Sequence, residues 1–288
     1  MTTRVATLDA LARPSGTFLM VAIDQRESLR TMLLEHGHDA GDERLARFKL
    51  AVARELAPHA SGILIDDEYG AHVVEEAVRL VPRSCGVLLA VDLLEQEPGE
   101  VVEDTRLDER DEIPGGVVAL KLLVIWRDDA RRAERAETAR RFVELSERHG
   151  VLSVLEPVVR HDDREWAIVE AARELGAVGP SLYKCQVPLA GKGDPAEITR
   201  WCREIDAALP CPWVVLSQGV DPDDFPRAVE AACRGGASGM LAGRAVWTPA
   251  LAAEDPTPVL REHSVPRLRE LAAIVDAHGR PWRDKAAL

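Results

Sequence analysis

The chain has 288 residues, and 36 Lys and Arg against 49 Asp and Glu give it a formal net charge of −13 at pH 7. A hydrophobic fraction of 46% beside a charged fraction of 30% is typical of a globular protein and excludes a disordered or collagen-like chain. The negative balance disfavours a general nucleic-acid binder, because such proteins contact phosphates through clustered Lys and Arg.

The sequence contains no signal-peptide pattern and no apolar run of 18 residues, so we expect a cytoplasmic protein without a membrane partner. Its five cysteines are an odd number without a C-x-x-C pair, which predicts reduced thiols rather than a disulfide framework.

Short apolar segments alternate with longer amphipathic ones, which predicts a parallel sheet covered by helices. The predicted strands lie at residues 17–23, 62–65, 87–91, 118–124, 152–155, 181–185, 213–216 and 238–241. The predicted helices lie near residues 42–57, 71–80, 129–149, 164–175, 195–208, 224–234 and 257–277.

Eight repeats without a break in composition favour a closed (β/α)₈ barrel, the TIM-barrel fold, as a single domain over residues 1–288. The alternative, an open doubly wound sheet, requires a G-x-G-x-x-G turn after the first strand, but that strand ends in Asp24-Gln25-Arg26. Residues 94–114 are acidic and lack a helical apolar stripe, so we expect a long loop or a flap there.

In such barrels the reacting groups lie at the carboxyl ends of the strands, where the loops converge on one pocket. Candidate site residues lie in or just after the carboxyl-terminal part of each predicted strand. They are Asp24, Gln25 and Arg26, then Asp66, Asp67, Asp92, Lys121, Glu156 and Lys184, and finally Ser217, Gln218, Gly219, Gly243 and Arg244.

Lys121 and Lys184 lie within otherwise apolar strands, where an unpaired charge is costly to bury. A desolvated amine near a second cation becomes nucleophilic at neutral pH, as Schiff-base catalysis on a carbonyl requires. The alternative for each lysine is an internal salt bridge with a neighbouring acid. Two such lysines flanking Glu156, a group able to shuttle protons, favour the catalytic interpretation.

The last two strands end in Ser217-Gln218-Gly219 and Gly243-Arg244, where barrels of this type commonly bind phosphate. Glycine lets backbone N–H groups approach an oxyanion, and an arginine supplies a bidentate charged fork. Glycines that serve only tight turns are the alternative at each position, and the adjacent arginine favours a phosphate site.

Metal chemistry has little support, because the eight histidines form neither H-x-H nor H-E-x-x-H. Asp24, Asp66 and Asp92 have the oxygen ligands that magnesium prefers, but they serve equally to orient lysines. We therefore expect no metal and no cofactor.

The chain resembles the class I aldolases that include sulfofructosephosphate aldolase and tagatose-1,6-bisphosphate aldolase, and the resemblance covers nearly its whole length. The matching motifs are VAIDQR at 21–26, ALKLLVIWR at 119–127, EPVVR at 156–160, LYK at 182–184, GKG at 191–193, PWVVLS at 212–217, GASG at 236–239 and LAGRAVW at 241–247.

The resemblance implies that Lys184 forms the Schiff base, that Glu156 moves protons, and that Lys121 and Asp24 lie beside the imine. It places the phosphate of a ketose 1-phosphate at Ser217, Gly219, Gly243 and Arg244, and the other end of the sugar at Gln25 and Arg26. It also implies a homo-oligomer.

The activity implied is retro-aldol cleavage of 6-deoxy-6-sulfofructose 1-phosphate to dihydroxyacetone phosphate and sulfolactaldehyde. The nearest alternative is a tagatose-1,6-bisphosphate aldolase or an aldolase of another ketose 1-phosphate. A non-catalytic sugar-phosphate sensor is the alternative of another class. Three features depart from the sulfofructosephosphate pattern, namely Gln186, Gln218 and the run Asp67-Glu68-Tyr69. We expect Gln186 to point away from Lys184, whereas Gln218 adjoins the phosphate turn and affects substrate choice.

Overall fold

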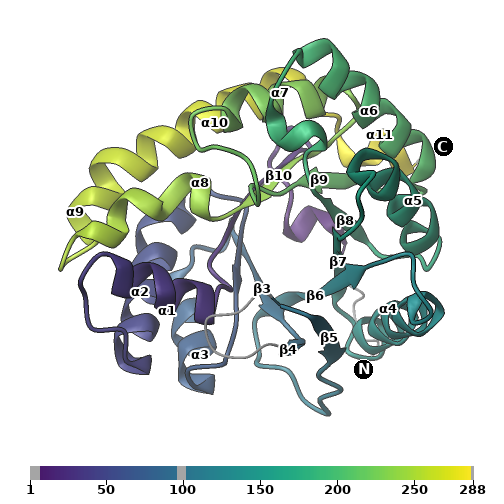
Figure 1. Cartoon of the computed structure of the whole chain (residues 1–288). Coiled ribbons are helices and arrows are strands. Elements are labelled where there is room, and N and C mark those ends of the chain that lie inside the picture. The colour runs from purple at the N-terminus through teal and green to yellow at the C-terminus, as the bar shows by residue number, and fades with distance from the viewer. Residues whose placement is uncertain (1–6, 96–101, 287–288) are drawn as a thin grey trace.

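The computed structural model describes residues 7–95 and 102–286, and its centre is a closed barrel of eight parallel strands (Figure 1). Around the barrel the order is β1, β10, β9, β8, β7, β6, β3 and β2, which confirms the predicted TIM-barrel fold. The barrel strands are β1 (Phe18–Ala22), β2 (Gly62–Ile65), β3 (Gly86–Ala90), β6 (Val117–Trp126), β7 (Leu152–Val159), β8 (Leu182–Cys185), β9 (Trp213–Val215) and β10 (Gly239–Ala242).

Alternation along the strands separates two apolar layers, because successive side chains of a strand point to opposite faces. One layer fills the barrel with side chains that include Phe18, Met20, Leu88, Val154 and Leu241. The other layer packs the outer strand faces against the helices. The strands are buried on both faces, which explains their nearly continuous apolar sequence.

Helices surround this barrel in Figure 1. They are α1 (Glu27–Glu35), α2 (Asp42–Leu56), α3 (Ala71–Leu80), α4 (Arg132–Arg148), α5 (Arg164–Gly176), α6 (Pro195–Ala208), α7 (Phe225–Arg234), α8 (Arg244–Trp247), α9 (Thr257–Val259), α10 (Val265–His278) and α11 (Trp282–Ala286). None of the helices formed by the described residues combines the length and apolar character needed to cross a bilayer.

The helices differ from the predicted ones around α1 and between α9 and α10. The helix α1 was not predicted, since its buried stripe consists only of Leu29 and Leu33 and leaves Leu34 exposed. The single helix predicted at 257–277 is α9 and α10 joined by a π-helical turn at Leu260–Ser264. Pro266 lies at the start of α10 and lacks an N–H, so regular helical hydrogen bonding cannot run through this point.

The segment predicted as a long loop or flap forms an antiparallel hairpin of β4 (Asp92–Glu95) and β5 (Asp104–Leu107) between β3 and β6. Its connection at 96–101 lies outside the described residues. Thr105 Oγ1 donates to the carbonyl of Leu123 on β6 at 2.7 Å, and Arg160 donates to the carbonyl of Val102 at 2.7 Å. These bonds attach the hairpin to the barrel.

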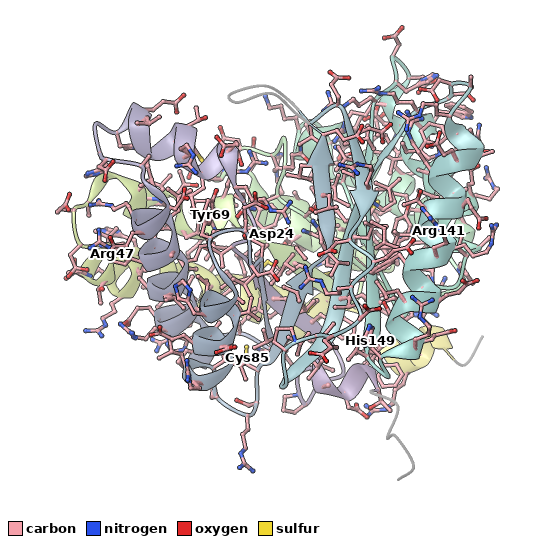
Figure 2. The ribbon with its side chains drawn as sticks, turned by 90° about the horizontal axis from the view of Figure 1, so that it is seen from below. Asp24, Arg47, Tyr69, Cys85, Arg141 and His149 are labelled. Carbon is pink, nitrogen blue, oxygen red and sulfur yellow. The ribbon has the colours of Figure 1, made fainter. Side chains whose placement is uncertain are left out.

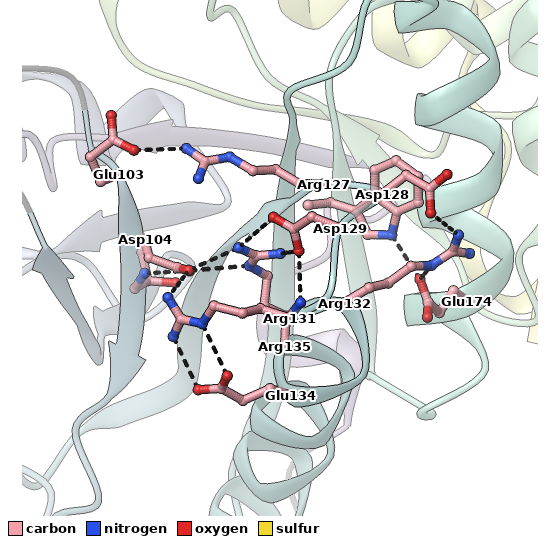
Figure 3. A network of polar contacts seen from close by, with 12 residues as sticks. Glu103, Asp104, Arg127, Asp128, Asp129, Arg131, Arg132, Glu134, Arg135 and Glu174 are labelled. Atoms are coloured by element: carbon pink, nitrogen blue, oxygen red, sulfur yellow. Dashed lines mark hydrogen bonds and ion pairs between the residues drawn. The ribbon is translucent and has the colours of Figure 1, made fainter.

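Ion pairs attach the same hairpin to α4 (Figure 3). Asp104 of β5 accepts from Arg135 at 3.0 Å and from Arg131 at 2.9 Å. Arg135 also donates to Asp129 at 2.6 Å, and Arg127 pairs with Glu103 at 3.0 Å. Both Asp104 and Arg135 have only 5% of their side chains exposed, so this contact is a buried ion pair.

Candidate active site

A cavity of about 460 Å³ opens at the carboxyl ends of the strands. Its wall combines residues from the barrel strands, from the N-terminal part of the chain around α1, and from the β4–β5 hairpin. The residues lining it include Asp24, Gln25, Arg26, Thr31, Met32, Glu35, Asp92, Leu94, Val102, Lys121, Leu123, Glu156, Lys184, Ser217, Gln218, Gly243 and Arg244.

The alternation that fills the barrel also brings the polar residues into this cavity. Lys121 lies two residues beyond the interior Ala119, Glu156 two beyond Val154, and Lys184 two beyond Leu182. Each polar side chain therefore points inward from the top of its strand. Figure 2 shows Asp24 in the interior, whereas Arg47 and Arg141 lie on the outer helices.

Glu156 bridges the two lysines. Its Oε1 lies 2.9 Å from Lys184 Nζ, and its Oε2 lies 2.9 Å from Lys121 Nζ. Their barrel strands are neighbours, and Leu155 pairs with Tyr183 in the residue pair just before Glu156 and Lys184. All three side chains are at least nine-tenths buried, so these contacts are screened much less than ion pairs at the surface.

Lys121 is a fixed cation. Its Nζ donates to Asp24 at 2.8 Å and to Asp92 at 3.1 Å in addition to the contact with Glu156. Desolvation lowers the pKa of Lys121, but the attraction of Asp24, Asp92 and Glu156 outweighs it and raises the pKa well above its ordinary value. For Asp24 the two effects have the opposite signs. Burial raises the pKa of this carboxyl, but the attraction of Lys121 and Lys184 outweighs burial and lowers the pKa below its ordinary value.

At the other side of the cavity lie the residues expected to bind phosphate. Ser217, Gly243 and Arg244 line it, whereas Gly219 is absent from the lining and adopts φ +79° in the turn behind Gln218. A Cβ on Gly243 would approach the carbonyl of Ala22 to 2.4 Å, so only glycine fits there. Burial lowers the pKa of Arg244, and Glu156 and Asp24 offset this only in part.

Arg26 is held by carboxylates. Its guanidinium donates to the carbonyl of Asp92 at 2.6 Å and lies 3.6 Å from the carboxylate of the same residue. Asp66 and Glu68 lie 3.9 and 3.7 Å from its Nε. The neighbouring Gln25 has its Oε1 buried without a hydrogen-bond partner among the described residues.

A family model described as DeoC/LacD family aldolase matches residues 18–249. The chain belongs to the DeoC/LacD aldolase family. Tagatose 1,6-diphosphate aldolase 2 of Streptococcus pyogenes serotype M3 is 26% identical over 94% of both chains, and the tagatose 1,6-diphosphate aldolase of Staphylococcus epidermidis is 27% identical over 86% of both.

Solved structures with this fold include a fructose-bisphosphate aldolase from Slackia heliotrinireducens, with a TM-score of 0.62 and 17% identity over 94% of this chain and 88% of that chain. An archaeal fructose-1,6-bisphosphate aldolase, with its catalytic Lys bound to a carbinolamine intermediate, has a TM-score of 0.60 and 17% identity over 93% of this chain and 98% of that chain. These structures share the fold of this chain.

The departures from the expected pattern have different surroundings in this aldolase. Gln186 is buried outside the cavity, where its side-chain carbonyl accepts from the Val159 N–H at 2.8 Å. Gln218 lines the cavity beside Ser217. Asp67 pairs with Arg110 at 2.7 Å, away from the cavity lining.

Sequence reasoning missed one buried group of the aldolase, Lys49 on α2. Its Nζ donates to the carbonyls of Ile23 and Gln25 at 3.0 and 2.8 Å and contacts the carboxylate of Asp66. These bonds hold the segment that carries Asp24. The signal was its place on the apolar stripe of α2, four residues after Leu45 and seven before Leu56.

The three aspartates considered as magnesium ligands bind lysines instead. Asp24 and Asp92 contact Lys121, and Asp66 contacts Lys49. Within residues 7–95 and 102–286 there is no group of three or more His, Cys, Asp or Glu side chains arranged to hold a metal ion.

Proposed function

We propose that this aldolase cleaves a ketose 1-phosphate through a Schiff base on Lys184 and releases dihydroxyacetone phosphate. The observation that carries the proposal is the buried chain Lys184–Glu156–Lys121 at one side of the cavity, with contacts of 2.9 Å on both sides of the carboxylate. Of the two lysines, Lys121 is held by three carboxylates and Lys184 by one, which leaves Lys184 as the nucleophile.

In this mechanism the Lys184 amine adds to the C2 ketone, and loss of water gives a protonated imine. The C4 hydroxyl gives up its proton, the C3–C4 bond breaks, and its electron pair moves into the imine to form an enamine. Protonation at C3 and hydrolysis then release dihydroxyacetone phosphate. Glu156, in contact with Lys184 through Oε1 and held by Lys121 through Oε2, is placed to move these protons.

The phosphate of the substrate is proposed to bind at Arg244, Ser217 and Gly243. Arg244 supplies the charge, Ser217 a hydroxyl donor, and Gly243 the open backbone beside them. Gly219 supports this site through its turn. Gln25 and Arg26 are proposed to face the other end of the sugar.

The first candidate substrate is 6-deoxy-6-sulfofructose 1-phosphate, with sulfolactaldehyde as the second product. Tagatose 1,6-bisphosphate is the second candidate, because relatives at 26% and 27% identity carry that activity in their names. Both substrates pass through the same enamine, so the Schiff-base test does not depend on the choice between them.

Borohydride trapping tests the proposal. Incubation with dihydroxyacetone phosphate and borohydride is expected to leave one reduced adduct, which peptide mapping places on Lys184. Lys184→Met should abolish the adduct and lower kcat at least about 1,000-fold, because the covalent route is lost. Lys192→Met, in the exposed loop that follows β8, is the matched control and should retain both. A wild-type protein with neither adduct nor turnover would favour the sensor alternative.

A further inference from the structure

Most of the positive charge in the cavity is already paired. Four basic side chains line it, namely Arg26, Lys121, Lys184 and Arg244. Lys121 and Lys184 contact carboxylates at 2.8 to 3.1 Å. Arg244 is the exception, with no carboxylate within 4.0 Å in the part of the chain that the structure describes. An anion that binds at Arg244 can therefore pair with its guanidinium without displacing a carboxylate.

Arg26, at the end assigned to the rest of the sugar, offers no comparable gain. Carboxylates of Asp66, Glu68 and Asp92 lie 3.6 to 3.9 Å from its guanidinium. Desolvation lowers the pKa of Arg26, and these acids together with Asp24 raise it overall. Of these carboxylates Asp92 lines the cavity, so an anion that approaches Arg26 also approaches Asp92, and repulsion offsets part of the attraction.

Among the described residues, the rest of the cavity wall adds no positive charge. Gln25, Thr31, Met32, Leu94 and Val102 are neutral, and Glu27 and Glu35 are acidic.

We propose that the cavity accepts a single dianionic group, at Arg244, and that the opposite end of the substrate is uncharged or carries one negative charge. This specificity rests on the proposed function. A second phosphate carries about −1.5 to −2 charges at pH 7, and it would lie near Asp92 and meet an arginine already shared among three carboxylates. Sulfofructose 1-phosphate meets the requirement, because a sulfonate carries one charge, whereas a 1,6-bisphosphate does not.

The aldol condensation tests this directly, because dihydroxyacetone phosphate stays constant while only the acceptor aldehyde changes. The acceptors are racemic glyceraldehyde, sulfolactaldehyde and glyceraldehyde 3-phosphate. We expect kcat/KM for glyceraldehyde 3-phosphate to lie at least about tenfold below that of the better of the other two, owing to like-charge repulsion. An equal or higher value for glyceraldehyde 3-phosphate overturns the inference.

Glu68→Gln provides a second readout, since its side chain is 52% exposed and lies 3.7 Å from Arg26. Removal of this charge should raise kcat/KM for glyceraldehyde 3-phosphate relative to glyceraldehyde by about threefold to tenfold. The control is Glu75→Gln on the exposed side of α3, which should leave the ratio unchanged. An unchanged ratio in Glu68→Gln counts against the inference.

Trapping of dihydroxyacetone phosphate in the same preparations separates the two proposals. An adduct on Lys184 combined with a preference for glyceraldehyde 3-phosphate overturns the single-dianion inference and leaves the Schiff-base assignment standing. Absence of the adduct overturns both.

Discussion

Glu156 makes a different contact with each of its two oxygens, Oε1 with Lys184 and Oε2 with Lys121. Because the carboxylate is held from one side by a fixed cation, its other oxygen keeps a constant position beside the reacting amine. A proton donor or acceptor works only within hydrogen-bond reach of the atom it serves. In the proposed mechanism Lys184 forms the imine and Glu156 moves the protons, and each of the two tasks has its own side chain.

Glu156→Gln removes the proton-transfer group and keeps the side-chain volume. We expect kcat to fall by about 100-fold to 10,000-fold, the range typical of lost general acid–base catalysis. Steady-state kinetics measures this loss, and borohydride trapping should still give some adduct on Lys184. The control is Glu144→Gln on the exposed side of α4. A Glu156→Gln enzyme with normal kcat would mean that another group moves the protons.

The places of Lys121, Glu156 and Lys184 in the cavity could be predicted from the sequence because strand alternation alone determines where these side chains point. A polar residue two positions beyond an interior apolar residue must enter the cavity at the top of a closed barrel. The partners of those residues could not be predicted in this way. Lys49 reaches Asp66 from a helix, and its contact depends on how α2 packs against β1 and β2.

At the scale of elements, the β4–β5 hairpin supplies one wall of the cavity through Leu94 and Val102. Leu107 of β5 packs into the core, but the hairpin sequence is acidic and Leu93 is exposed, so polar contacts provide much of its attachment. The pair between Asp104 and Arg135 is one of the buried contacts among them. Loss of one partner leaves a buried charge without compensation, which is costly.

Arg135→Ala should therefore loosen the hairpin. We expect the free energy of unfolding to fall by about 3 kcal/mol, as for other broken buried pairs, and urea unfolding measures it. In kinetics with the ketose phosphate, KM should rise about threefold to tenfold with little change in kcat, because the wall binds substrate in its ground and transition states alike.

Arg140→Ala is the matched control for this prediction, since Arg140 lies on the same helix in an exposed pair with Glu137. That variant should change stability by less than about 1 kcal/mol. An Arg135→Ala enzyme with reduced stability and unchanged KM would show that the ion pair supports the fold and not the cavity wall.

The hairpin also shows why part of the fold escaped prediction from sequence. Barrel strands can be recognised in the sequence as apolar runs because both of their faces are buried. In β5 the residues Asp104 and Thr105 are buried as well, but through partners on α4 and β6. Those partners are more than fifteen residues away in sequence, so no local pattern identifies the strand.

At the scale of the whole molecule, all five cysteines are free and buried. Burial raises the pKa of the thiols of Cys85, Cys185, Cys211 and Cys233 from 9.0 to about 12. The unfolded chain therefore loses these protons at lower pH than the folded chain. The contribution of these protonated thiols to the stability of the folded state is complete below pH 9, and it is lost as the pH rises towards 12.

As the pH rises from 9 to 12, each such thiol should reduce the free energy of unfolding by about 1.4 kcal/mol per pH unit. Urea unfolding at pH 8, 9, 10 and 10.5 measures the slope. Cys85→Ala removes one thiol, so its stability should fall less steeply with pH than that of the wild type. Parallel curves for the two proteins would contradict this account of alkaline destabilisation.

The order of the residues along the barrel separates two tasks. Lys121, Glu156 and Lys184 belong to the consecutive strands β6, β7 and β8, whereas Ser217 and Arg244 follow β9 and β10. In the proposed function, covalent chemistry and phosphate binding therefore belong to separate, adjoining stretches of the chain. A chimaera could take its residues from β9 onward from another barrel aldolase. It would then have a different phosphate-binding site and keep Lys121, Glu156 and Lys184, so the group by which the substrate is bound could be changed without changing the covalent chemistry.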